Sequence, residues 1–206
     1  MTFTIAEDVQ LMLTERPGRL EHERTLTAAG VLIELTLLGL LDSAKKPGHF
    51  ATPLDQLLTV TDSTPTGQPI LDVAMSILTD RDKPWRCDRA LLAISHPVTS
   101  AIDESLIVRG LARGIGDPSK STGYLEIIDD AAVEARRSVL QRARTLPDTV
   151  TESRLGAVVD ILRNSGNRFG GTTGLNPAST HDWYPTAATP TIVGILKAEH
   201  WLNLSE

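Results

Sequence analysis

The side chains that most often carry acid–base and nucleophilic chemistry are sparse in this sequence, which has five histidines and one cysteine in 206 residues. Ser95 precedes His96, but no glycine-rich elbow surrounds them to expose a nucleophilic serine. Cys87 is followed by an aspartate and lacks an electropositive helix start that would lower its pKa, so we expect a structural thiol. We interpret the His-Asp pair at 181–182 as part of an exposed loop. No residue is therefore assigned a catalytic role.

Patterns for metals, phosphates and nucleotides are also missing. One cysteine excludes a disulfide framework and a thiolate zinc site. The sequence contains neither a phosphate-binding loop that ends in Lys-Ser or Lys-Thr nor a dinucleotide fingerprint. We expect no metal and no cofactor. The use of cysteine fits a reducing cytoplasm.

The charge balance argues against nucleic-acid binding. It also indicates that an anionic partner, if there is one, binds to residues 81–170. The net charge is −6 and the pI is about 5.4, whereas nucleic-acid binding needs a broadly basic surface. Residues 1–80 carry 5 basic and 11 acidic groups, and residues 81–170 carry 14 and 12. The alternative interpretation of this middle segment is ordinary solvated helix faces of mixed charge.

Membrane contact is expected to be peripheral. The longest apolar stretch, residues 28–41, is interrupted by Glu34 and is too short to cross a bilayer. The first residues, Met-Thr-Phe-Thr-Ile-Ala-Glu-Asp, lack the basic and apolar regions of a signal peptide. We therefore expect a cytoplasmic location, with any attachment at the inner face of a membrane.

Composition and periodicity predict a mostly α-helical fold. Aromatic residues make up only 4% of the chain, so the core must be aliphatic, which favours packed helices. Helices are predicted over residues 4–13, 21–41, 69–78, 86–94, 99–113, 130–146, 151–162 and 190–204. A short strand is predicted over residues 57–60, and a long loop over residues 163–182. The helix at 130–146 is expected to turn four arginines outward: Arg136, Arg137, Arg142 and Arg144.

Three local features anchor these helices. Thr4 and Glu7 form a capping-box pattern at the start of the first helix. The helix at 21–41 is apolar on nearly all sides and should be central, so Glu34 needs a hydrogen-bond or cationic partner. Residues 65–67, Pro-Thr-Gly, should form a tight turn into a helix that begins near Pro69, with an aspartate in its first turn.

Several segments in the same order resemble the Golgi phosphoprotein 3 family. Residues 32–41, Leu-Ile-Glu-Leu-Thr-Leu-Leu-Gly-Leu-Leu, resemble its central helix. Residues 62–72, Asp-Ser-Thr-Pro-Thr-Gly-Gln-Pro-Ile-Leu-Asp, resemble its turn-to-helix element, and residues 106–111 its helix end with Arg-Gly. The segment 116–128 is similar in position to its β-hairpin. The resemblance spans roughly residues 4–166.

This resemblance implies a single domain over residues 1–206, in which 167–206 form a loop and a C-terminal helix. The fold would be one compact, mostly α-helical domain around a central hydrophobic helix, with one projecting β-hairpin. The resemblance also implies a peripheral binding protein rather than an enzyme. Eukaryotic members bind phosphatidylinositol 4-phosphate on Golgi membranes and recruit glycosyltransferases by their cytoplasmic tails. The short chain looks more like the bacterial members.

The phosphate-binding residues of the family do not carry over directly. Its arginine before the central helix falls at Ala28, and its tryptophan falls near Arg19. Its arginine pair falls at about His96 and Thr99 or, in an alternative register, at Ser100 and Asp103. A headgroup phosphate needs guanidinium forks, so their absence should weaken specific recognition. The hairpin tip, residues 117–123, is polar here.

A basic cluster with a tryptophan offers a replacement, because such a mixture suits a membrane interface. Its members lie within nine residues: Arg81, Lys83, Trp85, Arg86 and Arg89. Arg16, Arg19 and Arg24 flank the start of the central helix and could converge on the same face. In the hairpin, the candidates are Ser121, Tyr124 and Leu125. The alternative interpretation is ordinary surface charge, partly cancelled by neighbouring aspartates.

Two functions are compatible with the sequence. The first is a non-enzymatic peripheral membrane module that binds anionic phospholipid headgroups by electrostatics, with little selectivity. The second is a cytoplasmic adaptor that binds proteins or membrane-protein tails and has lost the phosphoinositide site. For the first, replacing Arg86 and Arg89 by glutamate should abolish vesicle binding and lower Tm by only a few degrees.

Overall fold

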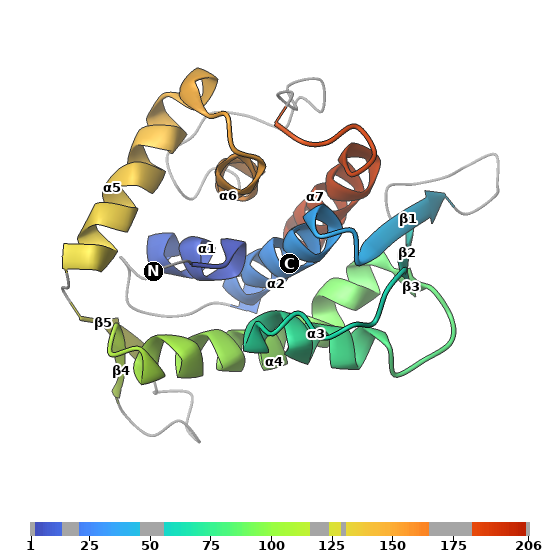
Figure 1. Ribbon diagram of the computed structural model, residues 1–206, viewed down its shortest axis with the longest axis horizontal. Coiled ribbons are helices and arrows are strands. Elements are labelled where there is room, and N and C mark those ends of the chain that lie inside the picture. The colour runs from blue at the N-terminus through green and yellow to red at the C-terminus, as the bar shows by residue number, and fades with distance from the viewer. Residues whose placement is uncertain are drawn as a thin grey trace.

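The computed structural model describes residues 3–13, 21–45, 56–115, 124–128, 131–164 and 183–204. Helices make up 66% of these residues, and two small antiparallel sheets account for the strands (Figure 1). The expected mostly α-helical domain with a small hairpin is confirmed. The expected loop at 163–182 and the hairpin tip at 117–123 lie outside the described residues, apart from Arg163 and Asn164, which end a helix.

The elements alternate between long helices and short strands. The helices are α1 (Ile5–Leu13), α2 (Glu21–Leu37), α3 (Pro69–Leu78), α4 (Cys87–Val108), α5 (Ala131–Thr145), α6 (Ser153–Asn164) and α7 (Thr189–Leu204), with a 3-10 turn at Pro147–Thr149. The strands are β1 (Leu41–Lys45), β2 (Gln56–Val60), β3 (Trp85–Arg86), β4 (Ala112–Ile115) and β5 (Tyr124–Ile127).

Helix α2 is the centre of the fold, as its apolar circumference predicts. It packs against α1, α3, α4, α6 and α7, which surround it in Figure 1. Leu32, Ile33 and Leu35 are fully buried, and Leu37 is half-buried. The helix ends four residues earlier than expected, because Gly39 has a φ of +75° and its amide, like that of the next residue, bonds back to the last turn.

Helix α4 corrects the prediction of two helices separated by Pro97. It runs unbroken from Cys87 to Val108 with Pro97 inside it. A proline in a helix costs about 3 kcal/mol, whereas each buried aliphatic side chain contributes about 1.5–3 kcal/mol. Aliphatic side chains on both sides of the proline are buried against α2 and α3: Leu91, Ile94, Val98, Ile102 and Leu106. Tertiary packing therefore outweighs the local break.

The C-terminal end of α4 is also earlier than the expected residue 113. The amides of Gly110 and Leu111 bond back to Ile107 and Leu106 and close the helix, so the Arg-Gly pair does mark a helix end. Ala112 then starts β4, which pairs with β5 in the expected hairpin and joins Ala112 to Ile127 and Ile115 to Tyr124.

The sheet β1–β2–β3 was only partly expected, since the sequence indicated β2 alone. Strand β1 pairs with β2 over its whole length, and β3 adds two residues at the other edge. The Gln56 amide donates to the Ser43 hydroxyl at 2.5 Å and to the Pro190 carbonyl at 2.9 Å. These contacts fix the sheet to the start of α7, which lies beside it in Figure 1.

The turn before α3 has the expected form. Gly67 has a φ of +72°, and α3 begins at Pro69. The Asp72 carboxylate accepts hydrogen bonds from the backbone N–H and the hydroxyl of Thr66, at 2.7 and 2.8 Å. The acidic residue of the first helical turn therefore fixes the turn that precedes the helix.

Among the described residues, α4 is the one helix that is long and apolar enough to be considered as a membrane span. That finding is weak, because the core helix of a soluble protein has the same length and composition. Ile94, Val98 and Ile102 are fully buried inside the fold.

Candidate functional site

The basic cluster lies at one corner of the molecule, where α3 ends and α4 begins. We call residues 79–89 the α3–α4 corner. Trp85 belongs to β3 and pairs with Leu58 of β2. Its indole N–H donates to the carbonyl of Leu78, the last residue of α3, at 3.0 Å. The sheet on one side and α3 on the other thus set the position of this half-buried ring.

Arg81 is bound to the corner itself. Its Nε donates to the Lys83 carbonyl at 3.1 Å and one Nη donates to the Pro84 carbonyl at 2.7 Å. Its guanidinium lies over the Trp85 ring, 3.9 Å from the ring centroid. A cation at that distance from an indole face is attracted by about 0.5–2 kcal/mol. Arg81 and Trp85 therefore form one ordered unit.

Arg86 is paired with an acid. Its Nε and one Nη donate to the two carboxylate oxygens of Asp88 at 3.1 and 3.0 Å. Asp88 lies in the first turn of α4, where a negative charge is favourable. This pairing offsets the charge of Arg86, although nearly half of its side chain is exposed.

Lys83 and Arg89 are the remaining cations of the corner. Both are exposed, and neither has an acidic partner among the residues that the structure describes. Asp80 and Asp82 are exposed in the same loop, so the corner holds four basic and three acidic side chains. The corner therefore has a net charge of +1, and its cations outside the Arg86–Asp88 pair are Lys83, Arg89 and the stacked Arg81.

The other candidates lie elsewhere. The Thr27 and Thr99 hydroxyl oxygens are 3.4 Å apart, which places Arg24, one turn before Thr27, beside the middle of α4. That position is about three helical turns from the start of α4. Arg16 and Arg19 are outside the described residues. The structure therefore does not bring Arg24 to the corner.

The hairpin is at the far end of α4, about 33 Å from the corner for a helix of 22 residues (Figure 1). Leu125 is half-buried and packs against the core, so it is not an exposed apolar tip. Tyr124 begins β5, and Ser121 lies outside the described residues. The corner and the hairpin are separate surfaces.

Two of the positions carried over from the family resemblance are enclosed by packing. Ala28 is fully buried, and Thr99 is buried where α2 meets α4. His96 and Ser100 are exposed, Asp103 is half-buried, and Arg19 lies outside the described residues. An arginine at Ala28 or Thr99 would need space that neighbouring buried residues occupy.

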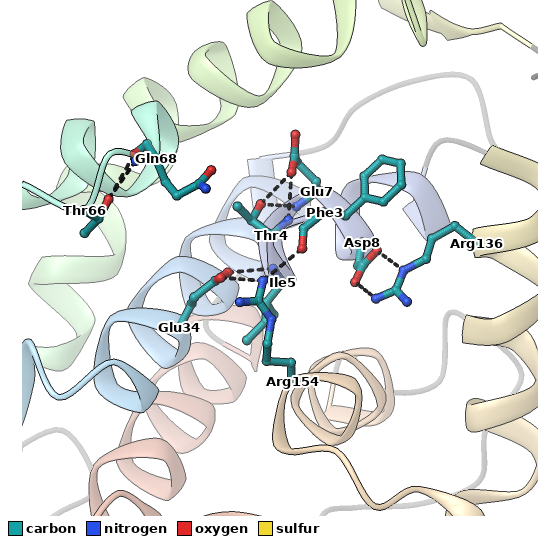
Figure 2. Close-up of polar contacts among 10 residues, drawn as sticks. All are labelled: Phe3, Thr4, Ile5, Glu7, Asp8, Glu34, Thr66, Gln68, Arg136 and Arg154. Atoms are coloured by element: carbon teal, nitrogen blue, oxygen red, sulfur yellow. Dashed lines mark hydrogen bonds and ion pairs between the residues drawn. The ribbon is translucent and has the colours of Figure 1, made fainter. Parts of the chain in front are cut away.

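A second polar cluster, which the sequence reasoning found only in part, lies in the core. Three buried acids each meet an arginine that is distant in the sequence. They are Glu7 with Arg109, Asp8 with Arg136 and Glu34 with Arg154. Figure 2 shows two of these pairs around the start of α1. We call these residues the arginine-clasp cluster.

The Glu7 end of the arginine-clasp cluster combines a helix cap with a cation. Glu7 accepts from the Thr4 backbone at 2.8 Å, and the Thr4 hydroxyl accepts from the Glu7 backbone at 3.1 Å, which confirms the capping box. The other Glu7 oxygen accepts from Ser105 at 2.9 Å and Arg109 at 2.6 Å. The Arg109 guanidinium also lies over the Phe3 ring, 4.6 Å from its centroid. These contacts join α1 to the end of α4.

Glu34 has the partners that its central position requires. One carboxylate oxygen accepts from the Ile5 N–H at 2.7 Å, and the other meets Arg154 at 2.6 Å. Arg154 also donates to the Phe3 carbonyl at 2.9 Å. Burial raises the pKa of Glu34, and the Ile5 amide and Arg154 only partly oppose that rise.

The prediction that Arg136 faces solvent is wrong, because Arg136 forms an ion pair with the buried Asp8. Arg136 Nε donates to one Asp8 oxygen at 2.8 Å, and an Nη donates to the other. Arg136 is half-buried between α5 and α1, and its neighbour Arg137 bonds the Leu11 carbonyl at 3.4 Å. Burial raises the pKa of Asp8 despite the Arg136 contact.

The described residues contain no group of three histidine, cysteine, aspartate or glutamate side chains that could hold a metal ion. Cys87 is the first residue of α4, which corrects the expectation that it lacks a helix start. It is nevertheless fully buried, and burial together with Asp88 raises its pKa to about 12. A thiol with this pKa stays protonated at neutral pH and is a poor nucleophile.

The fold and the corner define a mostly α-helical domain that carries a basic, tryptophan-containing surface far from its hairpin. Residues 5–168 match the family model described as Golgi phosphoprotein 3 (GPP34). The chain therefore belongs to the Golgi phosphoprotein 3 family, and the matched segment agrees closely with the one that the sequence motifs indicated. No curated protein matches the chain.

Proposed function

We propose that this protein is a peripheral membrane module that binds anionic phospholipid headgroups through the α3–α4 corner. The observation that supports the proposal is the combination of a fixed tryptophan with a stacked arginine and two exposed cations, Lys83 and Arg89. Tryptophan and basic side chains together suit the membrane–water interface. Family membership supports a binding module of this general type.

The binding is electrostatic and weakly selective among anionic headgroups, phosphatidylinositol 4-phosphate included. Each cation near an anionic surface contributes about 1 kcal/mol, and the attraction fades over a Debye length of roughly 8 Å at physiological salt. Lys83 and Arg89 dominate, since Asp88 offsets the charge of Arg86. The location that follows is cytoplasmic, at the inner face of a membrane, and the function uses no cofactor.

Vesicle co-sedimentation tests the proposal. The variant is Lys83→Glu with Arg89→Glu, because reversing Arg86 would place a second acid beside Asp88 and disturb the helix start. At low salt, we expect the wild type to bind vesicles that contain phosphatidylglycerol or phosphatidylinositol 4-phosphate. It should not bind neutral vesicles. The double variant should lose binding by more than about 100-fold, with Tm lowered by only a few degrees.

A matched control keeps the change in net charge and moves it away from the corner. Arg142 and Arg163 are exposed on α5 and α6, which lie on the other side of the molecule (Figure 1). Arg142→Glu with Arg163→Glu should retain most of the binding. If both double variants bind equally well, the corner is not the contact surface.

The second candidate is a protein-binding adaptor. It is favoured by the enclosure of Ala28 and Thr99, two positions at which the family resemblance places phosphate-binding arginines. Failure of the wild type to bind any anionic vesicle at low salt would select this candidate. In that case the exposed corner is a surface for protein partners or for tails of membrane proteins.

A further inference from the structure

We infer that Arg81 is a positioning residue, which orders the corner for membrane contact instead of binding a headgroup itself. This inference rests on the proposed function. The sequence grouped Arg81 with Lys83, Arg86 and Arg89 as four equivalent cations. The structure gives them different partners, and the partners of Arg81 all belong to the corner.

The hydrogen bonds of Arg81 close a short loop. Its Nε and Nη donate to the carbonyls of Lys83 and Pro84, the two residues just before Trp85. These two nitrogens form the side edge of a guanidinium, which is the edge that grips a phosphate or carboxylate with two parallel bonds. That edge of Arg81 is already occupied by backbone oxygens.

The flat face of the same guanidinium lies on Trp85, 3.9 Å from the ring centroid. The indole N–H is held by the Leu78 carbonyl at 3.0 Å. Trp85 is therefore fixed through its face by Arg81 and through its edge by the end of α3. The carbonyl of Leu78 belongs to the last turn of α3, so the anchor itself is part of a regular helix.

A fixed Trp85 has a consequence for affinity. A mobile aromatic side chain loses rotational freedom when it settles at an interface, whereas an ordered one has already lost it. The same holds for the backbone of residues 81–85, which carries Lys83. Arg81 thus strengthens membrane contact by presenting Trp85 and Lys83 in one arrangement.

A positioning role depends on the planar guanidinium of Arg81, whereas a role as a simple cation depends only on its charge. A lysine at position 81 keeps the positive charge, but it has neither a planar face for the indole nor a paired N–H edge for the two carbonyls. If Arg81 acts only as a cation, Arg81→Lys should leave vesicle binding unchanged. If Arg81 positions the corner, Arg81→Lys should weaken vesicle binding roughly 3- to 10-fold.

The experiment compares Arg81→Lys with the matched control Arg142→Lys on α5, since both make the same exchange and keep the net charge. Partitioning onto phosphatidylglycerol vesicles is measured by co-sedimentation, and amide hydrogen exchange across residues 81–86 is measured without vesicles. We expect Arg81→Lys to weaken partitioning and to accelerate exchange in this segment, and Arg142→Lys to change neither by more than about two-fold. The Tm of both variants should stay near that of the wild type, because both sites are exposed.

Each contrary result has a distinct meaning. Wild-type partitioning by Arg81→Lys overturns the inference and leaves Arg81 as a simple cation in the proposed site. Unchanged hydrogen exchange overturns the inference as well, whatever the vesicles show. If the wild type does not partition onto anionic vesicles, the proposed function fails, and the exchange data alone decide whether Arg81 orders the corner.

Discussion

Glu34 is deep inside the protein, yet its cation comes from the surface. Arg154 reaches it with a side chain that is 43% exposed, while Glu34 itself is 3% exposed. Removal of one partner of a buried pair is costly because the other charge stays buried and unpaired. The hydrogen bond from the Ile5 amide would remain in either case.

We therefore predict that Arg154→Ala lowers the free energy of unfolding by about 2–3 kcal/mol. Adding Glu34→Gln should restore most of this loss, because a neutral amide needs no cation and can still accept from the Ile5 N–H. Urea unfolding of the two single variants and the double variant measures the coupling. Additive losses in the double variant would mean that Arg154 stabilises the protein through other contacts.

The pH dependence of stability follows from Asp8 and Glu34. Burial raises their pKa values above the ordinary 3.8 and 4.5, so the folded protein binds these protons more tightly than the unfolded chain. Their contribution to stability is therefore full below these ordinary values and is lost as the pH rises through the raised folded pKa values. We expect Asp8→Asn with Glu34→Gln to make the slope of unfolding free energy against pH less negative above pH 4. The control Gln141→Asn, at an exposed site on α5, changes no titratable group and should leave that slope unchanged.

At the scale of elements, the docking of α1 on α2 depends on close backbone approach at Gly30. A Cβ at this position would lie 3.1 Å from two backbone atoms of Ala6, and backbone cannot move as a flexible side chain can. We predict that Gly30→Ala lowers the free energy of unfolding by about 1–3 kcal/mol. Gly114→Ala is the control, because nothing lies within 4 Å of its Cβ. If both variants have the same free energy of unfolding, α1 moves to make room for the added methyl group without loss of stability.

The exposed face of α4 extends the proposed contact surface. Arg89, Leu92 and His96 are spaced at i, i+3 and i+7 and are all exposed, so they share one face of the helix. Leu92 is 44% exposed. Its side chain is placed one turn beyond Arg89, where it can enter the interface beside the headgroups.

We predict that Leu92→Ser weakens vesicle binding about 3- to 10-fold without changing its salt dependence, since the lost contribution is apolar. The control is Val139→Ser, which removes an apolar side chain of similar exposure from α5. A steeper or shallower salt dependence in Leu92→Ser would contradict an apolar role.

Most helices could be predicted because their signals are local. The capping box at Thr4, Pro69 at the start of α3 and the apolar circumference of α2 each depend on residues within a few turns. The continuity of α4 through Pro97 could not be predicted, because it depends on burial against α2 and α3. Strands β1 and β3 were missed for the same reason, since both are short and exist only through pairing with β2.

At the scale of the whole molecule, the sequence indicated which residues form the corner but not how they differ. Lys83 and Arg86 have similar neighbours in the chain, yet only Arg86 meets Asp88 as a paired fork. The arginine-clasp cluster could not be predicted from the sequence either, except that Glu34 was expected to need a partner. Arg109, Arg136 and Arg154 are each about 100 residues or more from their acids, and only the packed fold brings such distant side chains together.

The corner and the hairpin lie at opposite ends of α4, so the orientation of the protein on a membrane depends on which end makes the contact (Figure 1). The proposed function requires the corner. Single labels can distinguish the two orientations, because Cys87 is buried with a pKa of about 12 and should not react with a thiol probe at neutral pH. The label sites are exposed positions: Asp82 in the corner, Arg113 in β4 and Gln141 on α5.

We predict that a polarity-sensitive fluorophore at Asp82→Cys shifts to shorter wavelength when phosphatidylglycerol vesicles are added. The same fluorophore at Gln141→Cys should not respond, because α5 lies on the other side of the molecule. The probe at Arg113→Cys should respond little, since about 33 Å of helix separates the two ends and headgroup contacts act over roughly 8 Å. A response at Arg113→Cys with none at Asp82→Cys would mean that the hairpin end meets the membrane and that the corner faces away from it.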